Sequence, residues 1–522
     1  NMLLILPLIV LLIDILYLLI RKENNILLPS LTASLSISAF LVMEFSFLSN
    51  LYDFVYVWSY SELSLPIIYK VVAIWAGEAG SIMTWMVFNS IVIVLYRIKG
   101  KSKGDIIFNW STLLALIVSV IFYAILISLN PFLVETPILF PDGLGLNSVL
   151  LSPFMIWHPF FTFIAYAVFL IPFTITLVEI IKPKLTLQND YQKSFYNFVL
   201  KFGWLVLSLS IGLGAYWAKI TFTWGRYWGW DPVEIVSLIP WFFTTTFFHG
   251  TMFKSKKALL IKINVVMIFL SIIFTTLITR GGGLTSLHAF TGESELVIWV
   301  MIVGIILAIL ALYVIYIVIN YLLEEYQKHK LFFDYLSYLF LYGLAFVFIF
   351  GLIIPPLTIF LSNFLPIIAF SIGPEYFIVT SLILSTGLAI TLTFCSLWEY
   401  FTLKWIGTVI IIAFLIQILF SYILFSFIRI WINPFLIIYF ISLISSIFKL
   451  VKTFNPKKGT KYFFRLNSKT IIHAGISLIF AGFLMIAIYQ DIFFISGFIL
   501  LLIGIIPSIL ISFLSRKNVL QA

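Results

Sequence analysis

Long apolar runs recur along the whole chain, separated by short polar segments. A bilayer core about 30 Å thick requires roughly 20 apolar residues per helix, and the chain contains about fifteen runs of that length. We therefore predict an all-α, polytopic integral membrane protein that forms a single membrane domain over residues 1–522. The predicted spans are 2–20, 26–48, 71–96, 106–129, 158–181, 199–217, 235–253, 258–279, 295–320, 332–355, 376–397, 405–427, 430–448, 470–488 and 492–514.

The composition supports this assignment. Of the 522 residues, 62% are hydrophobic and 10% are charged, so there is too little polar surface to cover a water-soluble globule. The single cysteine, Cys395, lies in an apolar run, so this chain by itself offers no disulfide and no CxxC redox pair. The net charge of +10 comes from basic residues in short loops, which indicates membrane lipid, and not nucleic acid, as the partner.

Lysine and arginine are divided unevenly between alternate loops. One set of loops holds most of them, for example Arg97 and its neighbours, whereas the other set holds only Lys70, Lys219, Arg226, Arg280 and Arg429. Because cytoplasmic loops retain basic residues, we predict that the N-terminus lies outside and the C-terminus inside. The predicted outer loops are 49–70, 130–157, 218–234, 280–294 and 356–375.

The outer loop 218–234 and the residue before it are rich in tryptophan: Trp217, Trp224, Trp228 and Trp230. Two glycines in the same stretch let the backbone approach a flat surface closely, which suits a planar apolar ligand. The alternative is an aromatic belt at the membrane boundary, and composition alone favours the belt. Asp231 and Glu234 either orient a ligand histidine and the loop, or Glu234 caps the following helix with Pro232 in its first turn.

Four of the five histidines form two pairs by predicted depth, and we interpret the fifth, His329, as solvated. His158 opens the predicted span 158–181, and His288 lies in the outer loop 280–294. Imidazole is a common axial ligand of haem iron, so this pair on either side of the Trp-rich loop suits a bis-histidine haem. Solvated loop histidines are the alternative.

His249 and His473 form the second pair. They lie near the predicted inner ends of two helices that run in opposite directions. Ionisable residues inside a membrane are costly and therefore indicate a function. A haem held between the two helices is one interpretation, and histidines hydrogen-bonded to a neighbouring helix are the other.

The segment from Trp224 to Glu234 resembles the tryptophan-rich WWD signature of the haem-handling proteins of cytochrome c maturation, and its continuation to Pro240-Trp241 resembles the CcmF/NrfE branch. Departures from the family pattern are Arg226, Ile235-Val236, Ala79, Phe160, Gly281 and the lack of a large outer domain between the last two helices. Other similar segments are Leu65-Pro66 with Tyr69-Lys70, Trp75 to Ser81, Asp142-Gly143 with Leu146-Asn147, His158-Pro159 with Tyr166, Arg280 to Phe290, and His473-Ala474-Gly475.

This resemblance implies a haem lyase that works in a multi-subunit complex of an energy-transducing membrane, either a prokaryotic cytoplasmic membrane or the mitochondrial inner membrane. It would join haem through thioether bonds to the CxxCH motif of apocytochrome c on the outer face. The implied partners are a CcmE-like haem chaperone, the apocytochrome, a CcmH-like thiol-handling chaperone and a quinol as candidate reductant.

The resemblance also implies roles for individual residues. His158 and His288 would be axial ligands of the haem in transit, and His249 and His473 would hold a permanent b-type haem. The implied haem-handling residues of the loop are Trp224, Trp228, Trp230, Asp231 and Glu234.

Three other functions remain open at this stage. A WWD-family haem transporter would have outer histidines without the inner pair, and a single-chain cytochrome c synthetase usually has Lys where this chain has Val233. A solute transporter predicts acidic or broken helices at the midplane, whereas few acidic residues lie inside the predicted spans. The inner histidine pair favours the haem lyase.

Overall fold

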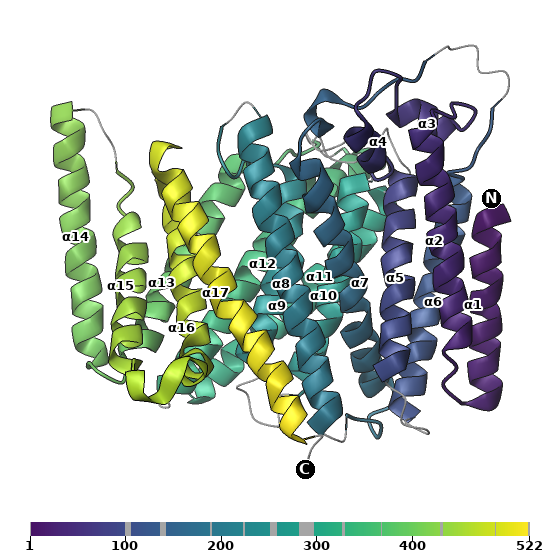
Figure 1. Ribbon diagram of the computed structural model, residues 1–522. Coiled ribbons are helices and arrows are strands. Elements are labelled where there is room, and N and C mark those ends of the chain that lie inside the picture. Colours follow the sequence, from purple (N-terminus) through teal and green to yellow (C-terminus); the bar gives the residue numbers. More distant parts are fainter. Residues whose placement is uncertain are drawn as a thin grey trace. The chain divides into compact units, whose positions relative to one another are not determined.

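The computed structural model is built from helices (Figure 1). It describes residues 2–99, 106–135, 142–187, 190–222, 225–250, 258–280, 297–325, 329–366, 368–428, 432–485 and 487–519. Their contacts divide the chain into two compact units: unit 1 holds residues 1–217 and 268–300, and unit 2 holds residues 218–267 and 301–522. The all-α fold class is confirmed, whereas the single membrane domain over 1–522 stays a prediction.

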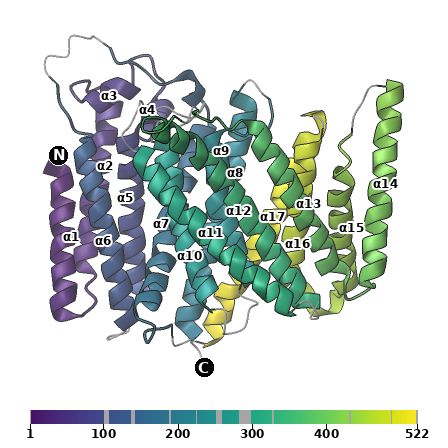
Figure 2. The ribbon, with the colours of Figure 1, turned by 180° about the vertical axis from the view of Figure 1, so that it is seen from behind.

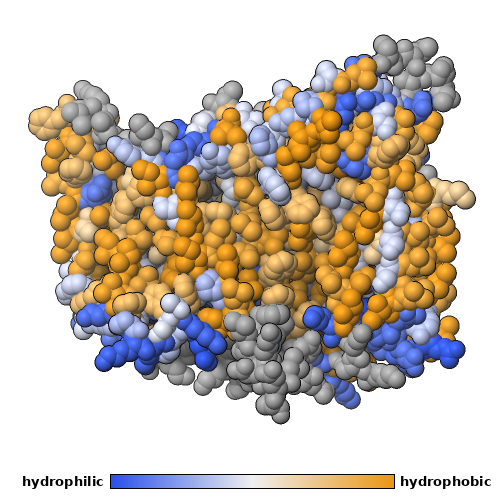
Figure 3. All heavy atoms as spheres, in the orientation of Figure 1, coloured by the Kyte–Doolittle hydropathy of each residue, from blue (hydrophilic) through white to orange (hydrophobic). Residues whose placement is uncertain are grey.

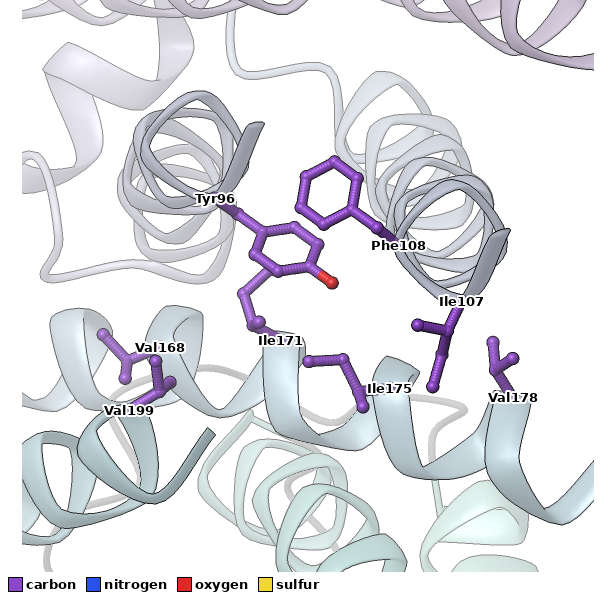
Figure 4. Packing of buried hydrophobic residues seen from close by; sticks show 8 residues of the cluster. All are labelled: Tyr96, Ile107, Phe108, Val168, Ile171, Ile175, Val178 and Val199. Carbon is purple, nitrogen blue, oxygen red and sulfur yellow. The ribbon is translucent and has the colours of Figure 1, made fainter. Parts of the chain in front are cut away.

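Unit 1 packs its long helices around aromatic and branched side chains. Tyr96 and Phe108 face one another with ring centroids 4.4 Å apart, next to Ile171 and Ile175 (Figure 4). The Tyr96 hydroxyl is 2.6 Å from Ser111 Oγ, so its polar end is satisfied within this apolar cluster. The helices of unit 1 are α1 (Met2–Arg21), α2 (Leu27–Leu48), α3 (Val55–Tyr60), α4 (Ile67–Ala73), α5 (Glu78–Lys99), α6 (Ile106–Leu129), η1 (Ser148–Leu150), α7 (Phe154–Ile181), most of α8 (Asp190–Thr221) and the second half of α10 (Ala258–Arg280).

The connections of unit 1 meet in two groups, at opposite ends of its helices. At one end, Asn24 Nδ2 donates to the Arg97 carbonyl at 2.9 Å, which joins two of the basic loops. At the other end, the Val55 amide donates to the Leu133 carbonyl at 3.0 Å, which joins the predicted outer loops 49–70 and 130–157. The alternation of basic and non-basic loops therefore matches the two ends of this unit. Which end faces the cytoplasm stays a prediction.

Arg97 is not the solvated loop cation that its sequence position indicates. Its Nη1 is 3.0 Å from Oδ1 of Asp14 in α1, and the two side chains are 1% and 0% exposed. An unpaired charge inside an apolar helix bundle has a high desolvation cost. Each of these two residues supplies the opposite charge that offsets this cost for the other. The pair ties α1 to the end of α5.

Unit 2 contains α9 (Pro232–Gly250), most of α11 (Val297–Glu325), α12 (His329–Ser362), α13 (Pro374–Leu397), α14 (Leu403–Ile428), α15 (Leu436–Thr453), η3 (Pro456–Lys458), α16 (Gly459–Leu484) and α17 (Ala487–Val519). Glycines bring α16 and α17 into backbone contact, because a Cβ on Gly475 would lie 2.6 Å from the Gly497 carbonyl oxygen. Figure 2 shows α11 and α12 from the side on which they lie in front.

Each predicted span overlaps a helix, and 13 helices in the described part of the chain are long and apolar enough to cross a membrane. On the face that Figure 3 shows, hydrophobic residues cover the middle of the helices and hydrophilic residues gather toward their ends. The remaining two predicted spans, 235–253 and 470–488, correspond to α9 and α16, which are not among the 13. Both carry a histidine and several polar residues, for example Thr244 and Ser477, which are buried inside unit 2.

The predicted span 71–96 begins too early. Its first residues belong to α4, and α5 begins only at Glu78. Between the two helices the Tyr56 hydroxyl donates to the Ile74 carbonyl at 2.7 Å and accepts from the amides of Gly77 and Gly80 at 3.2 and 3.1 Å. A tertiary contact with one tyrosine therefore breaks an apolar run that hydropathy alone treats as continuous.

Candidate functional site

His249 of α9 and His473 of α16 face each other inside unit 2. Their ring centroids are 6.2 Å apart, and their planes differ by 16°. His249 Nδ1 lies 2.9 Å from the Thr245 carbonyl oxygen, one turn back along its own helix. A carbonyl can only accept, so Nδ1 carries the proton and Nε2 is the nitrogen that would ligate a metal.

The separation of these rings fits a metal between them. Two imidazole nitrogens at about 2 Å from an iron, with each ring centre about 1 Å beyond its nitrogen, place the centroids roughly 6 Å apart. The described residues contain no group of three or more His, Cys, Asp and Glu side chains that could hold a metal ion. Two imidazoles leave the four equatorial positions of an iron to a macrocycle, so the pair fits a bis-histidine haem.

His158 lies in the first turns of α7 and is partly buried against α8. Its Nδ1 is 2.8 Å from the Ser210 carbonyl oxygen, and its ring centre is 5.8 Å from that of Trp217. The approach of the two helices requires Gly214, because a Cβ there would lie 2.8 Å from both Cε1 and Nδ1 of His158. As in His249, the carbonyl partner leaves Nε2 as the metal-binding nitrogen.

Two of the tryptophans next to and within the loop, Trp217 and Trp228, are buried, which contradicts the aromatic-belt interpretation for these two residues, whereas Trp230 is half-buried. Trp217 and Trp228 are 4% and 7% exposed, whereas a belt requires rings at the lipid boundary. Trp228 and Trp230 each lie 6.3 Å from Phe483 of α16, measured between ring centroids. The Trp228 indole N–H is buried and finds no acceptor in the described part of the chain. It is a donor that a ligand could satisfy.

The backbone of the loop is strained at Trp230, which has a φ of +60°, in the left-handed region that side chains other than glycine rarely adopt. Glu234 Oε2 accepts hydrogen bonds from the backbone amides on either side of Trp230, from Gly229 at 2.8 Å and from Asp231 at 3.3 Å. Asp231 Oδ2 in turn accepts from the Val233 amide at 3.1 Å. Asp231 therefore caps the start of α9, and Glu234 in the first turn binds back to the Asp231 amide, so both carboxylates hold the loop and the helix end.

Two of the predicted site residues, Trp224 and His288, lie outside the described residues. Sequence reasoning assigned no role to Tyr227 of the loop, and it missed two residues that contact the loop, Phe483 and Asp491. Asp491 lies 272 positions after its partner Lys219, so no local pattern could have connected them.

Fold and site together define an all-helical polytopic membrane protein with a histidine pair that fits a haem. Residues 75–288 match the model of the Cytochrome C assembly protein family. The chain is 32% identical to the cytochrome c-type biogenesis protein NrfE of Haemophilus influenzae over 274 residues, which are 50% of this chain and 41% of that protein. It is 30% identical to the cytochrome c-type biogenesis protein CcmF of Escherichia coli over 266 residues, 49% of this chain and 40% of the relative.

A solved structure, the cytochrome c haem lyase CcmF, has a similar fold, with a TM-score of 0.66 and 16% sequence identity. The match covers 94% of this chain and 76% of that one. The sequence matches, in contrast, span about two fifths of the length of these curated relatives. The chain is therefore similar to the cytochrome c assembly protein family over residues 75–288, and to the CcmF, NrfE and CycK proteins over about half of its length.

Proposed function

We propose that this protein is a cytochrome c haem lyase, which joins haem to the CxxCH motif of apocytochrome c on the outer face of the membrane. The observation that carries the proposal is the pairing of His249 and His473 with ring centroids 6.2 Å apart. A haem transporter of the WWD type has no need of such an inner pair. A solute transporter needs neither this pair nor the buried Trp228 of the same unit.

In this proposal His249 and His473 hold a resident b-type haem through their Nε2 atoms. When bound, that haem supplies a one-electron redox centre. The chain contributes the two ligands, the Thr245 carbonyl that fixes the protonation of His249, and the tight crossing of α16 and α17 that holds His473 in place.

The haem that is transferred is the substrate, and the resemblance assigns His158 and His288 as its axial ligands. The Ser210 carbonyl and Gly214 orient the His158 ring. The Trp-rich loop would support the porphyrin, so that two cysteine thiols of the apocytochrome add across the two vinyl groups. Each addition forms one carbon–sulfur bond and transfers the thiol hydrogen to the vinyl group, so the protein contributes mainly by positioning the reactants. A haem chaperone and a thiol-handling chaperone would supply the two substrates.

The absorption spectrum of the purified full chain tests the proposal. We expect a Soret band with the features of a bis-histidine haem, and we expect His249→Ala and His473→Ala each to abolish these features. His158→Ala is the matched control, because it removes a histidine from unit 1 and should leave the inner haem spectrum intact. If no Soret band is found in the wild-type protein, every haem function is excluded.

Activity is measured separately, by co-expression with an apocytochrome and detection of covalent haem on a denaturing gel. We expect His158→Ala to lose the product although the protein is inserted and keeps its inner haem. If His158→Ala forms product at the wild-type level, its role as a ligand of the substrate haem is wrong.

A further inference from the structure

Asp491, in the first turns of α17, contacts two residues of the Trp-rich loop 218–234, Lys219 near its start and Tyr227 near its middle. Its Oδ1 forms an ion pair with Lys219 Nζ at the end of α8. The same oxygen accepts a hydrogen bond from the Tyr227 hydroxyl at 2.6 Å. Lys219 Nζ also lies 4.9 Å from the centre of the Tyr227 ring. Two side chains of the loop, Lys219 and Tyr227, therefore share one carboxylate oxygen of α17.

Aromatic contacts extend this connection to the tryptophans. The Tyr227 ring stacks on Phe494 of α17 at 4.3 Å with an angle of 2° between the planes. Phe494 meets Phe483 edge-on at 4.8 Å, and Phe483 in turn contacts the rings of Trp228 and Trp230. Since these residues all belong to unit 2, the path from Asp491 to the tryptophans is continuous within one compact body.

We propose that Asp491 is a positioning residue of the Trp-rich loop, which fixes Tyr227 and, through the Phe494–Phe483 contact, the rings of Trp228 and Trp230. The inference rests on the proposed function in so far as these rings support the substrate haem. Residues 225–231 form no regular secondary structure and include the strained Trp230. Such a segment keeps one conformation only when several tertiary contacts over-determine it.

The carboxylate acts locally and contributes little to global stability. The Asp491 side chain is 48% exposed, and ion pairs with that exposure contribute little to the stability of a fold. Its effect is on the local opening of residues 225–231. Such local opening requires less free energy than unfolding of the whole protein. Poorly held rings would misplace the substrate, so product formation should fall while the inner haem stays bound.

Hydrogen exchange of the full-length protein in detergent tests the inference without any haem assay. We expect Asp491→Ala to accelerate exchange of the amides in 225–231 by about five-fold or more, with no change in α12 or α13. Tyr227→Phe, which keeps the ring stack and loses the hydrogen bond, should give a smaller acceleration in the same residues. Asp491→Glu should restore part of the protection. Glu375→Ala is the matched control, because Glu375 is an exposed acid in the first turn of another helix of unit 2.

The outcomes separate this inference from the proposed function. If exchange in 225–231 is the same in Asp491→Ala and Glu375→Ala, the positioning role is overturned. If Asp491→Ala fails to insert into the membrane, hydrogen exchange of Tyr227→Phe replaces it. Exchange in 225–231 equal to that of Glu375→Ala then overturns the positioning role. If exchange accelerates as expected but the wild-type protein attaches no haem to an apocytochrome, the positioning role stands and the haem lyase function fails. Covalent product that falls several-fold in Asp491→Ala and recovers in Asp491→Glu, with an unchanged inner haem spectrum, supports both.

Discussion

Glu234 holds Trp230 in a left-handed backbone conformation by accepting hydrogen bonds from the amides of both neighbouring residues. The same carboxylate lies in the first turn of α9 and holds the amide of Asp231 at the start of that helix, which ends at His249 and Gly250. The turn that presents the tryptophan and the helix that carries an inner histidine therefore depend on one side chain.

Replacement of Glu234 should loosen both features. We expect Glu234→Ala to lower the stability by about 1–2 kcal/mol, because a cap is lost and buried amides lose their acceptor. Thermal unfolding in detergent measures this loss as a lower Tm. Asp231→Asn is the matched control, since Asn caps a helix about as well as Asp. An unchanged Tm for Glu234→Ala would contradict the capping role.

The ion pair between Asp14 and Arg97 gives a second prediction. Asp14→Ala leaves the Arg97 guanidinium buried without its counter-charge, which should cost about 3–5 kcal/mol and reduce the amount of inserted protein. The double variant Asp14→Leu with Arg97→Leu should recover most of the yield, because it removes both charges. Quantitative immunoblotting of membranes compares the three proteins. Equal yields would show that the pair is dispensable.

Gly214 gives a prediction about His158. Gly214→Ala places a methyl group 2.8 Å from the imidazole, so the ring must move away from the Ser210 carbonyl. We expect covalent haem attachment to fall at least ten-fold, about 1.4 kcal/mol, while the inner haem spectrum stays unchanged. Gly407→Ala is the control, because its Cβ would meet its nearest neighbour, Phe394, only at 4.0 Å. If Gly214→Ala attaches haem at the wild-type level, the observed position of the His158 ring is not needed for haem attachment.

The connection between the predicted outer loops should depend on pH through Asp142. Its Oδ1 accepts from the Leu63 amide at 2.7 Å, and this hydrogen bond lowers the pKa of the Asp142 carboxyl below its usual range. Because the folded-state pKa is the lower one, the stabilisation is complete above the unfolded pKa of about 3.9 and is lost as the pH falls through the folded pKa. The Tm difference between wild type and Asp142→Asn should therefore be largest at neutral pH and shrink below about pH 4. A difference that grows with acidity would contradict this sign.

Hydropathy predicted the helices because burial in lipid is a property of each segment by itself. It failed at 71–96, where the Tyr56 hydroxyl interrupts an apolar run, and at Arg97, whose partner Asp14 lies in another helix. Both failures depend on side chains that are far apart in the sequence, and no local pattern contains them.

The sequence by itself determined the membrane class, the positions of the helices, the four candidate histidines and the family resemblance, since each of these is written in composition, local pattern or motif. Only the tertiary structure decided that His249 and His473 lie at a haem-ligand spacing, that Trp228 is buried, and that Asp491 connects α17 to Lys219 and Tyr227. The physical reason is that spacing, burial and ion pairing are set by the packing of helices distant in sequence, and an apolar helix surface permits many packings until its glycines, aromatic rings and charges select one.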